Sequence, residues 1–161
     1  MIAAMDLPFI LKLVHLLGAT VLFGTGLGIA FFMWMAARSG DAKTIVQVAG
    51  IVVVADMVFT ATAVAVQPMS GAALAWSMGY LLTEPWIIAA VVLYVLVGAC
   101  WLPVVGIQLR LRDLAVEAAN ANAPLPATFH RLFRIWFWLG WPAFIGVIAI
   151  FAFMIAKPSL W

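Results

Sequence analysis

Long uninterrupted runs of apolar residues dominate the pattern of this chain. Four of them stand out, at residues 8–37, 44–69, 85–109 and 132–156. Each exceeds the roughly 20 residues that a helix needs to cross the ~30 Å hydrocarbon layer of a bilayer. The runs lack the period-two alternation of barrel strands, and a helix in lipid satisfies its own backbone hydrogen bonds. The pattern therefore predicts an all-α fold, an integral membrane four-helix bundle that contacts the lipid bilayer on all sides.

Composition agrees with this pattern. Of the 161 residues, 68% are hydrophobic and only 9% are charged, whereas about a quarter of a soluble domain is charged. No linker divides the chain, so residues 1–161 are expected to form a single transmembrane domain. The first run is about twice as long as the apolar core of a signal peptide and no basic stretch precedes it, so we expect it to stay in the mature protein.

Basic residues are distributed unevenly between the two ends of the predicted helices. Six of the eight Lys and Arg lie around the first and third connections, and only Lys12 and Lys157 lie toward the other end. By the positive-inside rule, these two connections face the cytoplasm and both termini face out, an N-out/C-out topology. Because topology accounts for the basic residues, the net charge of +2 calls for no nucleic acid partner.

The three connections differ in character. Residues 38–41 form a short, turn-like connection, so helices one and two should be antiparallel neighbours. Residues 70–84 mix glycine, Trp and Tyr with apolar residues, which predicts an outer interfacial segment between helices two and three. Residues 110–126 predict a cytoplasmic extension of helix three that ends at an Asn- and Pro-containing turn.

One acidic residue, Asp56, lies deep in a predicted span. Thr60 and Gln67 follow at i+4 and i+11, which places all three along one helix face. A charge at the bilayer centre is costly, so an ionisable group there is a candidate for a proton relay or for a cation or substrate site. The structural alternative is a hydrogen-bonded carboxyl that holds helices together. The residues leave both alternatives open.

His15 lies about 10 Å below the outer surface if its helix enters the membrane near residue 8. Gly18 and Gly26 lie on or beside its face and would leave room for a flat macrocycle. Haem iron is commonly held by an axial His, often with Met as the second ligand. Tyr94 reaches about the same depth and Met154 lies somewhat higher. These positions make His15 a candidate haem ligand; the alternative, which position alone favours, is a structural His with a partner such as Tyr94.

Several motifs along nearly the whole chain resemble those of an uncharacterised bacterial family of predicted integral membrane proteins, a domain of unknown function. They are Arg38-Ser39-Gly40-Asp41, Gln67-Pro68, Gly98-Ala99-Cys100-Trp101-Leu102-Pro103, His130-Arg131-Leu132-Phe133-Arg134 and Gly140-Trp141-Pro142-Ala143, together with Asp56 and a first helix that contains His15. The resemblance implies a multi-pass protein of the bacterial inner (cytoplasmic) membrane.

The stretch Leu11-Lys12-Leu13-Val14-His15-Leu16-Leu17-Gly18 also resembles, more distantly, the first helix of HemJ-type protoporphyrinogen oxidases and CopD-type copper proteins. HemJ-type proteins bind haem b and have a functional histidine in this helix, so the resemblance implies haem binding by His15. They also carry a functional lysine in a later span. Here the lysines, Lys12, Lys43 and Lys157, all lie near predicted membrane surfaces.

Three hypotheses of function follow. The leading one is a small redox protein that binds haem b through His15 and transfers electrons from a quinol (quinone pool) or a porphyrin. Its candidate catalytic residues are Asp56, Thr60, Gln67 and Tyr94, of which the first three would form a proton path.

The second hypothesis is a membrane transporter or copper-handling protein that uses Asp56. The soft ligands suited to Cu(I) in that case would be His15 and the outward methionines Met5, Met69, Met78 and Met154. The third is an accessory subunit or scaffold, a homodimer or part of a larger membrane complex, that docks through the small residues Gly24 and Gly28.

Overall fold

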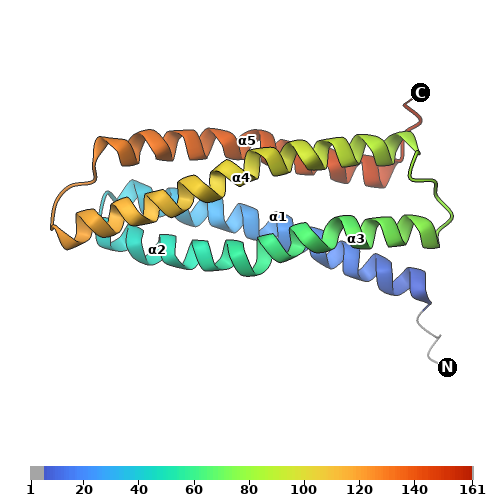
Figure 1. Ribbon diagram of the computed structural model, residues 1–161, viewed down its shortest axis with the longest axis horizontal. Helices are drawn as coiled ribbons and strands as arrows, with labels where there is room; N and C mark the ends of the chain where they lie inside the picture. Colours follow the sequence, from blue (N-terminus) through green and yellow to red (C-terminus); the bar gives the residue numbers. More distant parts are fainter. Residues whose placement is uncertain (1–5, 161) are drawn as a thin grey trace.

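The computed structural model describes residues 6–160, and its regular structure over that range is entirely helical. The elements in chain order are α1 (Leu7–Ser39), α2 (Ala42–Ala55), η1 (Asp56–Thr60), α3 (Ala61–Ser77), α4 (Pro85–Asn120) and α5 (Ala127–Ala156). Because α2, η1 and α3 are continuous, they form one span, and within the described residues four helices are long and apolar enough to cross a membrane. Figure 1 shows these helices as long rods, with both ends of the chain on the same side of the bundle. The predicted all-α, four-helix membrane fold is confirmed.

The second span is longer than the sequence predicts. It continues as α3 to Ser77, so only residues 78–84 remain as the outer connection instead of 70–84. The added turns are rich in Ala, the best helix former. The helix ends in a Schellman motif at Gly79 (φ 76°), where Gly79 N–H donates to Trp76 O (3.1 Å) and Tyr80 N–H donates to Ala75 O (2.9 Å).

The opposite end of the bundle is closed by the turn between α1 and α2. Gly40 takes the left-handed conformation (φ 68°), and Asp41 caps α2. The Asp41 carboxylate accepts hydrogen bonds from the Thr44 hydroxyl (2.6 Å) and the Thr44 N–H (2.9 Å), which hold the pKa of this carboxyl below its ordinary value. On the same side, α4 extends to Asn120, as the sequence predicts.

The packed core is concentrated toward the end of the bundle that holds this turn. Its fully buried side chains include Met33, Ile45, Leu111 and Phe129, contributed by four different helices. A smaller cluster at the other end, which we call the outer cluster, consists of Ala75, Trp86 and Ile87 with Tyr80 and Met154 packed against them.

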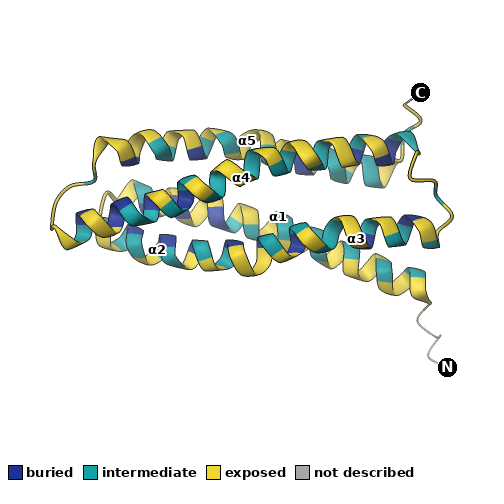
Figure 2. Ribbon diagram, viewed as in Figure 1, coloured by how far each residue is buried: buried dark blue, intermediate teal, exposed yellow. Residues whose placement is uncertain are grey.

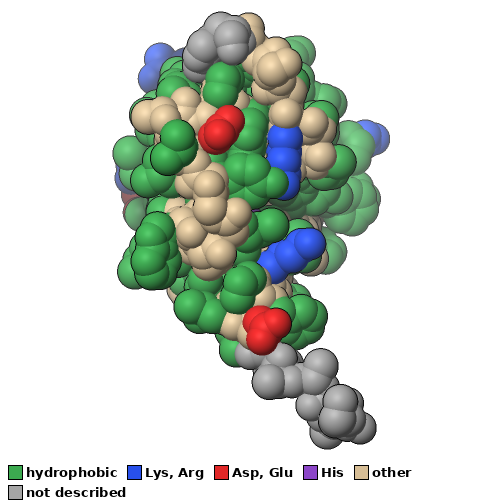
Figure 3. All heavy atoms as spheres, turned by 90° about the vertical axis from the view of Figure 1, so that its right-hand side faces the viewer, with side chains coloured by type: hydrophobic (Ala, Val, Ile, Leu, Met, Phe, Trp, Pro, Cys, Tyr) green, Lys and Arg blue, Asp and Glu red, His purple; other side chains and the backbone are tan. Residues whose placement is uncertain are grey.

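The outside of the bundle is apolar. Large hydrophobic side chains such as Ile51 (70% exposed) and Ile155 (84% exposed) face outward, and Figure 2 shows exposed positions along the outer sides of the helices. The end view in Figure 3 shows a few separated charged side chains among hydrophobic ones. A bilayer is the environment in which such a surface is stable.

Helix α4 packs along α5, α1 packs along α3, and α2 contacts both α1 and α4. Gly146 of α5 packs directly against Val97 of α4, since a Cβ added at Gly146 would lie 2.6 Å from Val97 Cγ2. A valine side chain is stiff in a helix, so it cannot turn away from such a contact at low cost. Across the bundle, Phe23 of α1 stacks on Phe144 of α5, with 4.9 Å between ring centroids.

Replacing Gly146 with Ala should therefore destabilise the protein. We expect Gly146→Ala to lower the free energy of unfolding, measured in mixed detergent micelles, by about 1–3 kcal/mol, because the new methyl overpacks against Val97. Val97→Ala in the same chain should restore much of that loss. Gly140→Ala is the matched control, since nothing lies within 4 Å of its added Cβ. Equal losses at Gly146 and Gly140 would contradict the proposed contact.

Candidate functional site

Polar side chains gather between α1 and α3 in the half of the bundle that lies toward the chain termini. We call His15, Gln67 and Ser70 the outer polar cluster. His15 Nδ1 lies 3.0 Å from Ser70 Oγ, and the Ser70 hydroxyl donates in turn to Gln67 O (3.2 Å). Ser70 is buried (6% exposed), so the cluster joins the two helices inside the bundle rather than at its surface.

The Gln67 side chain crosses from α3 to the backbone of α1. In the orientation that satisfies both ends of its amide, the NH₂ group donates to His15 O (3.0 Å) and approaches His15 Nδ1 (3.2 Å), while Oε1 accepts from Ala19 N–H (3.0 Å). Nδ1 of His15 is thus engaged by α3 side chains. Its other ring nitrogen, Nε2, makes no hydrogen bond to any residue from 6 to 160.

Two glycines make room for these side chains. A Cβ added at Gly18 of α1 would lie 3.0 Å from the side-chain amide of Gln67, and one added at Gly71 of α3 would lie 3.1 Å from His15 Cε1. Each helix therefore supplies a glycine on which the polar side chain of the other helix rests. This reciprocal fit interlocks α1 and α3 at the outer polar cluster.

A second polar site lies midway along the second span, where Asp56 and Thr60 are buried (3% and 6% exposed). Trp101 Nε1 of α4 donates to Asp56 Oδ1 at 3.4 Å. The other carboxyl oxygen, Asp56 Oδ2, and the Thr60 hydroxyl are buried and have no hydrogen-bond partner among the described residues. Burying a polar atom without a hydrogen bond costs about 1–3 kcal/mol of stability. Asp56 and Thr60 therefore differ from the other buried polar side chains of the described chain, which have partners.

The backbone at this site is also unusual. Residues 56–60 form the π-helical turn η1, in which Ala61 N–H donates to Asp56 O across five residues. Such turns are rare and occur often at functional sites, because the extra residue changes the direction in which side chains point. The turn begins and ends with the two buried polar residues, Asp56 and Thr60.

The Tyr94 hydroxyl pairs with the backbone of α3 and not with the His15 side chain. The hydroxyl donates to Val64 O (2.5 Å). Pro68 of α3 has no N–H with which to satisfy that carbonyl four residues earlier, so Tyr94 of α4 takes its place. The contact joins α3 to α4 and supplies the hydrogen bond that Val64 O lacks within its own helix.

A third polar contact lies in the half of the bundle opposite the termini. Gln108 of α4 is buried (1% exposed), and Trp136 Nε1 of α5 donates to its Oε1 at 3.3 Å. The sequence pattern did not mark Gln108 or Trp136 as a site residue.

The structure brings some predicted site residues together and separates others. His15 meets Gln67, and Asp56 lies one turn from Thr60. Gly26 is about 16 Å further along α1 than His15, with nothing within 4 Å of its added Cβ. Met154 packs in the outer cluster beside Ala75.

Of the methionines considered for copper, Met69 and Met78 are exposed (73% and 47%), Met154 packs in the outer cluster, and Met5 lies outside the described residues. Over residues 6–160, no three or more His, Cys, Asp or Glu side chains are grouped as metal ligands.

Sequence reasoning missed the two closest partners of the predicted residues, Ser70 and Trp101. Ser70 follows Gln67 by three residues and so shares its helix face, which was a usable signal. Trp101 and Asp56 lie on different helices, so no residue spacing in the sequence could predict their contact.

Fold and sites together define a multi-pass integral membrane protein with polar contacts inside a four-helix bundle. The family model described as "Predicted integral membrane protein (DUF2269)" matches residues 9–158, and the chain belongs to this family, whose function is unknown. The family predicted from the motifs is thereby confirmed, while the more distant likeness to HemJ-type and CopD-type proteins is not shown. No curated protein and no solved structure matches the chain.

The pairing of Tyr94 with the carbonyl freed by Pro68 can be tested by a double-mutant cycle. Tyr94→Phe should lower the free energy of unfolding by about 1 kcal/mol, since it leaves Val64 O without a donor in lipid. In a Pro68→Ala background the restored N–H satisfies Val64 O, so the same change should cost much less. Additive effects of the two substitutions would show that they do not share this carbonyl.

Proposed function

We propose that this protein conducts or couples protons in the membrane and that Asp56 is the group that takes up and releases the proton. The observation that carries the proposal is the buried Asp56 Oδ2, which has no hydrogen-bond partner in the described chain and lies midway along the second membrane-spanning helix. An ionisable group at this depth is expensive to keep unless it has a function.

The surroundings of Asp56 favour a proton over a metal cation. Its neighbours are an indole N–H donor from Trp101 and the hydroxyl of Thr60. Hard cations such as Ca²⁺ take six to eight oxygen ligands, and a donor N–H close by repels a cation. A single carboxyl with one fixed donor suits a site that is alternately protonated and ionised.

Polar groups on either side of Asp56 support a path along the bundle. Toward the termini, Gln67 of the outer polar cluster follows Thr60 by seven residues, or about 10 Å of helix. In the other direction, Gln108 follows Trp101 by the same interval on α4. Protons would cross the stretches between these groups on water molecules bound to the buried polar atoms.

Proton flux into liposomes with a trapped pH indicator tests the proposal. Wild-type protein should dissipate an imposed pH gradient, and Asp56→Asn should reduce the rate at least tenfold, because the amide keeps the shape and the Trp101 contact but cannot release a proton. Asp113→Asn is the matched control, since Asp113 is a half-exposed carboxylate paired with Arg112 at the end of the bundle. Equal rates for wild type and Asp56→Asn would refute the role of Asp56.

A second candidate function, haem b binding through His15 in a membrane redox protein, is favoured by one specific feature. Nδ1 of His15 is held by the outer polar cluster and Nε2 is left without a hydrogen bond in the described chain. Histidines that bind metals usually have one ring nitrogen fixed in this way by a hydrogen-bonding neighbour. His15 would then be the iron ligand, and Gln67 and Ser70 would fix its ring.

The fit of a haem at this position is partial. Gln67 fills the space beside Gly18, and Met154 packs with the outer cluster rather than against the imidazole. Bound haem b would supply one-electron chemistry with a quinol or porphyrin as electron donor.

We further infer a bacterial inner-membrane location from the distribution of basic residues.

Absorbance of the purified protein from haem-supplied cells distinguishes this second function. If His15 binds haem, wild type should show a Soret band that His15→Ala abolishes, while His130→Ala, an exposed histidine on α5, should leave it intact. A wild-type spectrum without the band, or one that His15→Ala does not alter, would remove haem. Neither result bears on the proton flux assigned to Asp56.

A further inference from the structure

We propose that α5 carries a binding site for an anionic phospholipid, such as phosphatidylglycerol or cardiolipin, at the end of the bundle opposite the termini. The site is a groove of about 550 Å³ lined by Arg131, Arg134, Ile135, Trp138 and Leu139. The offsets of 3, 4, 7 and 8 residues from Arg131 place all five on one face of α5.

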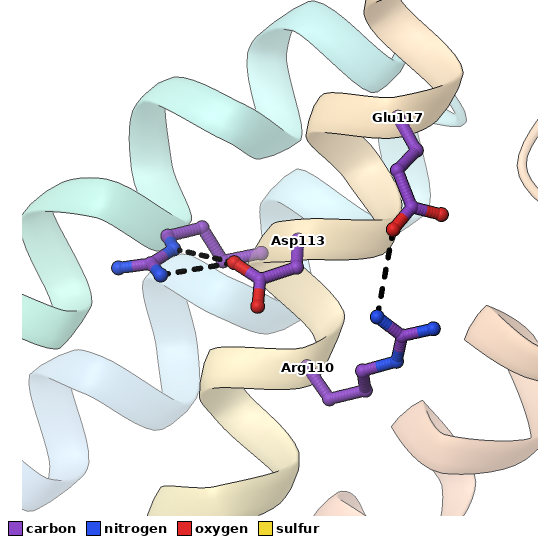
Figure 4. Close-up of polar contacts among 4 residues, drawn as sticks. Arg110, Asp113 and Glu117 are labelled. Carbon is purple, nitrogen blue, oxygen red and sulfur yellow. Dashed lines mark hydrogen bonds and ion pairs between the residues drawn. The ribbon is translucent and has the colours of Figure 1, made fainter.

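The charges of the groove lack acidic partners within the protein. Neither Arg131 nor Arg134 forms an ion pair or a side-chain hydrogen bond within residues 6–160. The arginines of α4 differ in this respect. Arg110 pairs with Glu117 at 3.5 Å, and Arg112 pairs with Asp113 at 2.9 Å, contacts that Figure 4 shows on the same helix.

The order of side chains along α5 matches a phospholipid from headgroup to acyl chain. The two guanidinium groups lie in the first turns of the helix, where a headgroup phosphate would accept hydrogen bonds from both. Trp138 lies about 6 Å deeper than Arg134 and is 68% exposed, and Ile135 beside it is 44% exposed. These apolar side chains would contact the acyl chain.

The apolar half of the groove selects a lipid over a soluble anion. Free phosphate would contact only the arginines and leave the surface of Trp138, Ile135 and Leu139 uncovered. Basic pockets beside apolar transmembrane surface are the setting in which proteins hold anionic headgroups, particularly on the cytoplasmic side. The positive-inside rule predicts that this end of the bundle faces that side.

Native mass spectrometry of the whole protein, released from detergent with equal amounts of phosphatidylglycerol and phosphatidylcholine, tests the site. Wild type should retain phosphatidylglycerol preferentially. The double variant Arg131→Gln/Arg134→Gln should weaken that retention roughly thirtyfold, the effect expected for the loss of two interfacial charges. The control Arg110→Gln/Arg112→Gln removes the same charge from α4 and should retain the lipid as wild type does. Equal losses in the two double variants would overturn the site.

Trp138→Ala separates a lipid from a phosphate ion. Because Trp138 is exposed, the variant should fold, which gel filtration checks. It should weaken phosphatidylglycerol retention severalfold and leave binding of inorganic phosphate unchanged. Unaltered lipid retention in Trp138→Ala, or displacement of the lipid by inorganic phosphate, would overturn the lipid assignment and leave an anion site only.

Discussion

The structure depends on one constraint, that polar groups inside a bilayer must find partners within the protein. The backbone meets this constraint by forming helices. Where a helix leaves a carbonyl free, a side chain replaces the missing donor, as Tyr94 does at Val64 above Pro68. Against this nearly complete pairing, the unpartnered oxygens of Asp56 and Thr60 in the described chain are exceptional. That contrast makes the middle of the second span the most informative place in the bundle.

Packing and polarity divide the bundle along its length. The end that holds the turn between α1 and α2 has the larger apolar core, whereas the outer half joins α1 to α3 through polar side chains seated on Gly18 and Gly71. Close approach of helices through glycine replaces the hydrophobic effect, which gives no net drive between helices in lipid. The polar cluster therefore joins the helix pair and leaves Nε2 of His15 without a hydrogen bond in the described chain.

Membership in a family of integral membrane proteins of unknown function leaves the chemistry to be argued from the sites. In the described chain the Asp56 carboxyl has one donor, Trp101, and one oxygen without a hydrogen-bond partner, and the proposal of proton exchange rests on these two features. The proposal of haem ligation rests on the His15 ring, which is held at Nδ1. The groove on α5 is a separate feature, since its arginines and Trp138 are exposed on the outside of the bundle.

Much of this protein follows from the sequence alone. Four long apolar runs are enough to predict four helices, because lipid permits few other backbone structures. Asp56 can also be identified as a candidate site residue, because acidic residues are rare within such runs. The end of α3 was predicted too early in the chain. The glycine and aromatic residues of 70–84 are as typical of a segment at the membrane surface as of the end of a helix.

Contacts between spans were beyond the sequence. The pairing of Asp56 with Trp101, of His15 with Ser70, and of Tyr94 with Val64 depends on how far each helix is rotated and shifted against its neighbours. Hydrophobic pattern does not determine rotation when every face of a helix is apolar. Only the tertiary structure, through close-packed glycines and a single π-helical turn, decides which polar groups meet.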